Sequence, residues 1–169
     1  MERKNASKKV AFMGAMFSLT LVLSFLEYNL LPPLPINGVK LGLSNIVIMY
    51  SVFFEGSYSA FSLGILKSVF VALTRGAVSG IISLFGGVIS IIVMIIANKL
   101  QKEKDSYVFT SILGGVFHNV GQLICASLLL KNLMVYYYLP ILIVSGIVFG
   151  FKTATILKIL VPYMKNIKH

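Results

Sequence analysis

Three polar side chains lie in the middle of the apolar segment 107–130. They are His118, Asn119 and Gln122, in the sequence Phe-His-Asn-Val-Gly-Gln. On a helix, His118 and Gln122 lie one turn apart on the same face, with Asn119 beside them. An imidazole or amide without a hydrogen-bond partner in hydrocarbon costs several kcal/mol, so these groups must face protein, water or a bound molecule. We expect them to bind a ligand; the alternative is a cluster of interhelical hydrogen bonds that only holds the bundle together.

Charged residues form a second group of candidates. Lys67 lies near the centre of the apolar segment 58–74, where a lysine costs about 2.5 to 3.5 kcal/mol on insertion scales. A carboxylate, a bound anion or a polar cavity must compensate for that cost. Glu27 is the acidic residue near the outer half of the membrane, and either Lys67 or Arg75 can pair with it. We expect Lys67 or Arg75 to pair with Glu27 or to compensate an anionic part of the ligand; the alternative for Arg75 and Lys40 is an interfacial anchor.

The segment 27–40 is expected to form a structured loop on the outer side. Three prolines and a glycine within it forbid a regular helix, and we expect it to act as a lid over the site. It leads through Lys40 and Gly42 to Ser44 and Asn45. These last two side chains can offer hydrogen bonds to a ligand, and the alternative is that one of them caps the helix that follows.

The composition determines which elements must position these groups. Of the 169 residues, 57% are hydrophobic and 12% are charged, whereas a soluble domain has about 25% charged residues. An apolar segment of about 20 residues crosses a bilayer as a helix. The sequence therefore predicts an all-α integral membrane protein, a single membrane domain (1–169) with six transmembrane helices. The predicted spans are 10–26, 41–54, 58–74, 81–98, 107–130 and 136–161.

Cationic residues gather at the two ends of the chain and near residues 99–104. With an even number of spans and the amino terminus inside, nine cations fall on the inner side, whereas the outer side receives Lys40, Arg75 and Lys131. Cytoplasmic flanks carry such an excess. We therefore expect a multi-pass protein of the cell membrane with both termini cytoplasmic. The net charge of +10 then indicates contact with anionic membrane lipids rather than with nucleic acid.

The chain lacks the residues that several catalytic and metal-binding functions require. The chain has one aspartate, Asp105, so it cannot form the paired Asp-rich motifs of a prenyl chain-elongating enzyme, and it has no G-x-x-x-x-G-K-[ST] phosphate loop. Its two histidines and single Cys125 do not form a cluster that would hold a transition metal. The sequence favours a protein without catalytic residues, cofactor or metal.

The motifs together resemble a known family. They are Leu-Glu at 26–27, Leu-Pro-Pro-Leu-Pro at 31–35, Gly38, Lys-Leu-Gly-Leu-Ser-Asn at 40–45, Gly-Gly at 86–87, His-Asn-x-x-Gln at 118–122 and Tyr-Leu-Pro at 138–140. This pattern covers nearly the whole chain and resembles the Gx transporters, also called heptaprenyl diphosphate synthase component I. In overall plan that family is similar to the S components of energy-coupling factor transporters.

The resemblance implies a specific role. S components are six-helix proteins that capture a small molecule and dock onto a transmembrane T component with two ATPases. Their first helix carries an Ala-x-x-x-Ala docking motif, and Ala11 and Ala15 match that spacing. The resulting hypothesis is a substrate-binding subunit of a small-molecule uptake transporter, powered by separate chains. The alternative is a non-catalytic membrane subunit of a polyprenyl diphosphate synthase.

Overall fold

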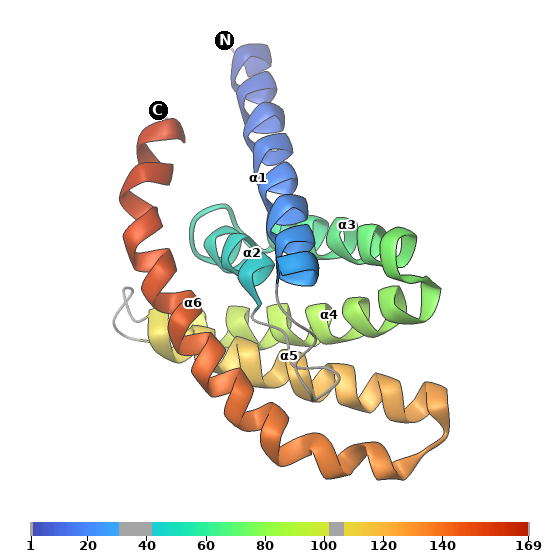
Figure 1. Ribbon diagram of the computed structural model, residues 1–169. Helices are drawn as coiled ribbons and strands as arrows, with labels where there is room; N and C mark the ends of the chain where they lie inside the picture. Colours follow the sequence, from blue (N-terminus) through green and yellow to red (C-terminus); the bar gives the residue numbers. More distant parts are fainter. Residues whose placement is uncertain (1, 31–41, 102–106, 169) are drawn as a thin grey trace.

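The computed structural model describes residues 2–30, 42–101 and 107–168 of the chain, and in these ranges it contains helices and no strands. Figure 1 shows the start of α1 and the end of α6 at the same end of the molecule. The prediction of an all-α protein with six helices is confirmed. The helices are α1 (Glu2–Leu30), α2 (Leu43–Phe54), α3 (Ser57–Arg75), α4 (Ala77–Leu100), α5 (Tyr107–Leu130) and α6 (Leu139–Lys168), and a 3-10 helix, η1 (Leu133–Tyr138), precedes α6.

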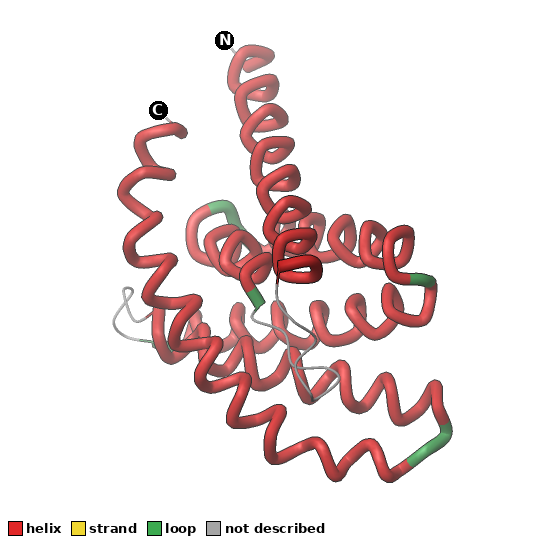
Figure 2. Tube along the Cα trace, in the orientation of Figure 1, coloured by secondary structure: helices red, strands yellow, loops and turns green. Residues whose placement is uncertain are grey.

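Five of the six α-helices are long and apolar enough to cross a membrane. The exception is α2, which has 12 residues and a length of about 18 Å at 1.5 Å per residue. The hydrocarbon core is about 30 Å thick, so α2 is too short to cross it alone, as the 14-residue apolar run already indicated. Each predicted span contains the greater part of one helix, and the connections between helices in the described ranges are short (Figure 2).

The short helix α2 is the buried centre of the protein. It packs against α1, α3, α4 and α6, and its side chains Val47, Met49 and Tyr50 are at most 2% exposed. In Figure 1, α2 lies between the two long outer helices α1 and α6. A short helix is stable at membrane depth only where other protein elements surround it, and the packing of α2 meets this condition.

Glycines bring α4, α5 and α6 into close contact. A Cβ atom added to Gly121 of α5 would lie 3.0 Å from the Cα atom of Gly86 in α4. One added to Gly115 of α5 would lie 2.6 Å from the carbonyl oxygen of Gly146 in α6. Small residues at these positions let the backbones approach, which is how helices associate in lipid without a hydrophobic driving force. These three helices therefore form the closely packed part of the bundle.

Alanine at Gly146 is expected to lower the stability of the protein. Its Cβ atom would lie 2.7 Å from the Cα atom of Val116, and overpacking of this kind costs about 1 to 3 kcal/mol. The control is Gly14→Ala on α1, where nothing lies within 4 Å of the added atom and the higher helix propensity of alanine should stabilise slightly. Thermal unfolding in detergent measures both. Equal midpoints for the two variants would contradict the close packing.

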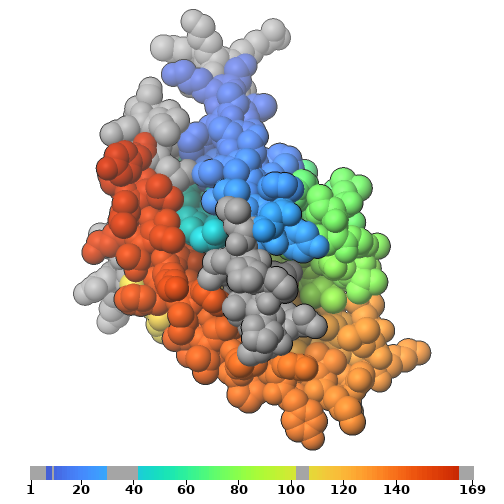
Figure 3. Space-filling view, in the orientation of Figure 1, coloured from blue at the N-terminus to red at the C-terminus, as the bar shows by residue number. Residues whose placement is uncertain are grey.

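Large apolar side chains cover the outside of the bundle. Val22 and Phe25 on α1, and Val144 and Phe151 on α6, are between 53% and 59% exposed. Figure 3 shows α1 in blue and α6 in red-orange on one face of the molecule. A monomeric soluble protein does not present apolar surface on this scale, so the outer surfaces of these helices contact lipid.

Candidate functional site

A polar cavity lies inside the apolar bundle, and all six α-helices contribute to its wall. Its volume is about 50 Å³, which is room for several water molecules when one needs about 10 to 15 Å³. Polar groups at this depth need partners, so the cavity is the natural candidate for a binding site. The lining residues are Ser24, Glu27, Gly42, Ser44, Asn45, Met49, Lys67, Val71, Arg75, Ser83, Ser90, Met94, Ser111, Gly114, Gly115, His118, Asn119, Gln122, Gly146, Phe149, Gly150 and Thr153.

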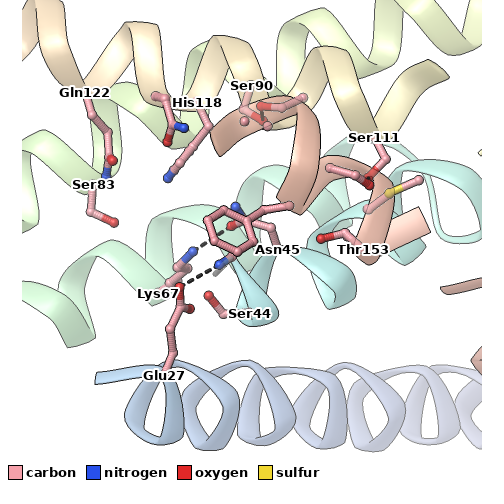
Figure 4. A pocket seen from close by; sticks show the side chains of 18 of the residues that line it. Glu27, Ser44, Asn45, Lys67, Ser83, Ser90, Ser111, His118, Gln122 and Thr153 are labelled. Atoms are coloured by element: carbon pink, nitrogen blue, oxygen red, sulfur yellow. Dashed lines mark hydrogen bonds between the residues drawn. The ribbon is translucent and has the colours of Figure 1, made fainter. Parts of the chain in front are cut away.

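The polar cluster of α5 lies on the cavity wall. His118 and Asn119 are buried, Gln122 is half-buried, and all three line the cavity. Figure 4 shows the His118 imidazole and the Gln122 amide on the side of the cavity where Ser83 also lies. The backbone permits this because Gly86 of α4 leaves space for Gln122: a Cβ atom there would lie 2.5 Å from Gln122 Cγ.

Asn119 also holds α5 against α6. Its Nδ2 atom donates a hydrogen bond to the carbonyl oxygen of Leu142, at 2.9 Å, and another to the hydroxyl oxygen of Ser145, at 3.1 Å. The structural alternative considered for the cluster therefore applies to Asn119. The Asn119 amide has the interhelical bonds of a structural group, although this residue also borders the cavity.

Lys67 and Asn45 form a polar contact between α3 and α2. Lys67 Nζ donates a hydrogen bond to Asn45 Oδ1 at 2.7 Å, and the lysine is 8% exposed. Figure 4 shows this bond at the cavity, with Glu27 and Ser44 close by. The ammonium group thus lies in a polar cavity, one of the three environments that its position in the sequence required.

Glu27 of α1 fixes the beginning of α2. Its Oε1 atom accepts a hydrogen bond from the backbone N–H of Gly42 at 2.6 Å. Gly42 has a φ of 69°, a left-handed conformation that glycine adopts without steric cost. Gly42 is also the N-cap residue of α2, and no side chain caps the helix. The capping role considered for Ser44 or Asn45 is therefore wrong.

Arg75, the last residue of α3, is bound to α1. Its Nη2 atom donates to the carbonyl oxygen of Ser24 at 2.8 Å and lies 3.4 Å from the Ser24 hydroxyl oxygen. The guanidinium carbon lies 4.3 Å from the centre of the Tyr28 ring, within the range of a cation–π interaction. Arg75 also interacts electrostatically with Glu27. It is therefore more than an interfacial anchor.

Hydroxyl side chains make up much of the wall, and the sequence analysis missed them. Ser90 of α4 donates to the carbonyl oxygen of Gly114 at 2.8 Å, and Ser111 of α5 donates to that of Gly150 at 2.7 Å. Serine is common in membrane helices because it can bond to its own helix, so single serines carry little signal. A useful signal was the spacing of Ser83 and Ser90, seven residues apart on α4, which places both on one helix face.

One hydroxyl at the cavity has no partner. The Oγ atom of Ser44 is buried without a hydrogen bond, and the residue is 1% exposed. A buried polar group left in this state costs about 1 to 3 kcal/mol. A bound molecule at the cavity can remove that cost for Ser44, whereas the hydroxyls of Tyr50 and Ser51, also buried without a partner, do not line the cavity.

The remaining predicted residues lie elsewhere. Residues 31–40 of the predicted loop, Lys40 among them, fall outside the described residues. The prediction that the loop begins at residue 27 is wrong, because α1 (Glu2–Leu30) continues until just before the prolines, which begin at residue 32. Ala11 and Ala15 are exposed on α1 and do not line the cavity. In the ranges that the structure describes, no three His, Cys, Asp or Glu side chains gather in a group that could hold a metal ion.

Comparison with known proteins identifies the family. No curated protein and no solved structure matches the chain. The family model described as heptaprenyl diphosphate synthase component I matches residues 16–160, a range that includes every residue lining the cavity. The chain belongs to the heptaprenyl diphosphate synthase component I family.

Proposed function

We propose that this protein is a substrate-binding subunit of an uptake transporter, and that it captures a small solute in the cavity between its six helices. The observation that carries the proposal is the concentration of polar groups within an apolar bundle. Lys67, Arg75, Glu27 and His118 come from three different helices and line the same cavity. Charged side chains inside membrane proteins are costly, and they mark substrate and ion sites.

The unpartnered Ser44 hydroxyl supports capture over a purely structural role. A network that only held helices together would satisfy its own donors and acceptors. At this cavity, Asn119 and Ser111 make such interhelical bonds, whereas the Ser44 Oγ atom has no partner. The site thus combines a rigid frame with a polar group that a solute can bind.

Energy for transport would come from partner chains. The sequence has no ATPase phosphate loop, and the resemblance to S components suggests a T component with two ATPases. Ala11 and Ala15 are exposed on α1, one turn apart, so they leave a shallow surface on which another helix can pack closely. We assign the docking of the T component to this surface.

Native mass spectrometry of the purified protein tests the proposal. We expect the protein released from detergent to retain a small molecule, seen as a discrete mass increase. The control variant Ser18→Ala removes an exposed hydroxyl on α1 that bonds only to its own helix. It should retain the same small molecule and show the same mass increase. If neither protein carries or takes up a solute from a cell extract, the capture function is wrong.

His118→Ala and Asn119→Ala are expected to have different effects. The first should reduce solute retention at least about tenfold, a loss of about 1.4 kcal/mol, because His118 lines the cavity. The second should lower the unfolding free energy by about 1 to 3 kcal/mol, since Asn119 bonds α5 to α6. Binding and thermal unfolding, measured on each variant, separate the two roles. A stability loss confined to His118→Ala would reverse this assignment.

The description of the family favours a second candidate function. It names a component of a heptaprenyl diphosphate synthase, so a membrane subunit that assists a soluble catalytic partner is the second candidate. Adding the purified protein to that catalytic partner and measuring chain elongation separates the two functions. A transport subunit leaves the elongation rate unchanged, whereas an accessory subunit raises it.

A further inference from the structure

The cavity has two chemically different ends. Lys67 and Glu27 lie at one end, and Ser90 and Ser111 lie at the other (Figure 4). Arg75 belongs to the first end, because it bonds to Ser24, one turn before Glu27 on α1. The His118 imidazole is on the α5 helix seven residues from Ser111, which is about 10 Å along the axis at 1.5 Å per residue. A solute that spans the cavity therefore meets different groups at its two ends.

The first end favours an anion. Its described lining contains two cationic side chains, Lys67 and Arg75, and one carboxylate, that of Glu27. These three groups together carry a single net positive charge. The Ser44 hydroxyl, buried and without a partner, adds a donor. A solute with one negative charge would neutralise this net charge, and the attraction is strong because the protein interior screens charge poorly.

The second end favours hydrogen-bond donors. The Ser90 hydroxyl donates a hydrogen bond to the carbonyl oxygen of Gly114, and the Ser111 hydroxyl donates one to that of Gly150. Each hydroxyl has one proton and two lone pairs, so these two can only accept hydrogen bonds from a solute. This part of the wall thus presents oxygen acceptors, while the first end presents N–H and O–H donors.

The donors of the solute at the second end must be neutral. A buried ammonium group needs a carboxylate partner, and the acidic residue on the described wall, Glu27, lies at the first end, where it accepts the Gly42 N–H bond. Serine hydroxyls suit a neutral hydroxyl or amide N–H. A zwitterion with an ammonium group at this end is therefore disfavoured.

We infer that the captured solute is a small hydroxylated organic monoanion, with its carboxylate or singly ionised phosphate at Lys67 and Arg75 and its hydroxyl groups at Ser90 and Ser111. This inference rests on the proposed capture function and specifies its substrate class. It follows from the charges on the wall and from the direction of the hydrogen bonds of Ser90 and Ser111.

Binding of a matched set of three-carbon probes to the full-length protein in detergent tests the inference. The probes are glycerate, propionate without hydroxyls, glycerol without charge, serine with an ammonium group, and glycerol 3-phosphate. Glycerate should bind at least about tenfold more tightly than propionate, serine or glycerol, because each of these leaves buried groups of the site unpaired. Comparing glycerate with glycerol 3-phosphate decides between carboxylate and phosphate. Propionate or serine binding as tightly as glycerate overturns the inference, as does a lack of binding by both hydroxylated anions.

Ser111→Ala tests the acceptor end directly. It should reduce the preference for glycerate over propionate about tenfold and leave propionate binding unchanged. Thr155→Ala is the control, since this exposed hydroxyl bonds only to its own helix. Ser90→Ala gives a second test if loss of the Ser111 bond between α5 and α6 unfolds the protein. An unchanged preference in the folded serine variants overturns the inference.

Failure of the inference can be distinguished from failure of the capture function. If mass spectrometry finds a retained neutral or cationic molecule that His118→Ala releases, the capture function stands and the substrate class is wrong. If the wild-type protein retains no molecule and binds no probe, both are wrong.

Discussion

Replacement of Lys67 by methionine is expected to lower the affinity for the captured solute at least about 100-fold, which corresponds to about 2.7 kcal/mol. Methionine has nearly the length of lysine but lacks its charge, so the change removes the ammonium group from the cavity and preserves the packing of α3. Removing one partner of a buried charged contact costs about 2 to 5 kcal/mol in a complex. Titration of the wild type and the variant with the retained solute measures the loss.

Stability should change much less than affinity. A lysine at mid-span costs about 2.5 to 3.5 kcal/mol on insertion scales, and methionine removes this cost. The change also leaves Asn45 Oδ1 without the bond from Lys67, which costs about 1 to 3 kcal/mol, so the unfolding temperature of the empty variant should stay close to that of the wild type. The matched control is Lys158→Met, which removes an exposed lysine from α6. A Lys67→Met protein that binds like the Lys158→Met protein would contradict a role for the ammonium group.

Arg75→Met is expected to lower the unfolding free energy by about 2 to 4 kcal/mol, the sum expected for charge-assisted hydrogen bonds and a cation–π contact. Arg75 is bonded to Ser24 of α1 and lies over the ring of Tyr28. Because α1 packs mainly against α2 and α3, this contact is a large part of what holds α1 to the bundle. Thermal unfolding in detergent measures the stability loss.

Two further variants distinguish the geometry of Arg75 from its charge. Arg75→Lys keeps the charge but loses the planar donor geometry, and we expect it to lie between the wild type and the methionine variant. The control Thr74→Val removes an exposed neighbouring hydroxyl whose bond is to Phe70 of its own helix. If Arg75→Met is as stable as Thr74→Val, the contact with α1 is not important for folding.

The sequence predicted the helices well because their signals are local. The apolar segment 107–130 coincides with α5 (Tyr107–Leu130), since polar residues follow both of its ends. The segment 41–54 could be recognised as short from its length alone. What it could not reveal is that α2 is the buried centre, because this depends on which helices surround it. The predicted spans 58–74 and 81–98 leave Gly80 between two helices, but it lies inside α4 against Ala72, and α3 and α4 are separated at Gly76.

Several residues of the site could be predicted from the sequence, but the contacts between them could not. A charge or amide within hydrocarbon is conspicuous in any membrane sequence, which is why Lys67 and His118 could be selected. The bond between Lys67 and Asn45 joins residues 22 positions apart, and no local pattern specifies such a pairing. Lys67 and Arg75 were both possible partners of Glu27, and its carboxylate also accepts a hydrogen bond from the backbone of Gly42. The backbone N–H of a glycine has no signature in the sequence.

The uneven packing of the bundle determines how the cavity can exchange its contents. Ser24 and Glu27, which are on its wall, belong to α1. This helix is held by apolar packing against α2 and α3 and by a few polar bonds. The opposite wall belongs to α4, α5 and α6, where glycines bring the backbones into close contact. Tilting the end of α1 at the cavity breaks two or three polar bonds and part of its apolar packing, while parting the other helices disrupts a closer interface. The cavity therefore has a hinged side and a fixed side, and backbone amides of α1 should exchange with deuterium sooner than those of α5.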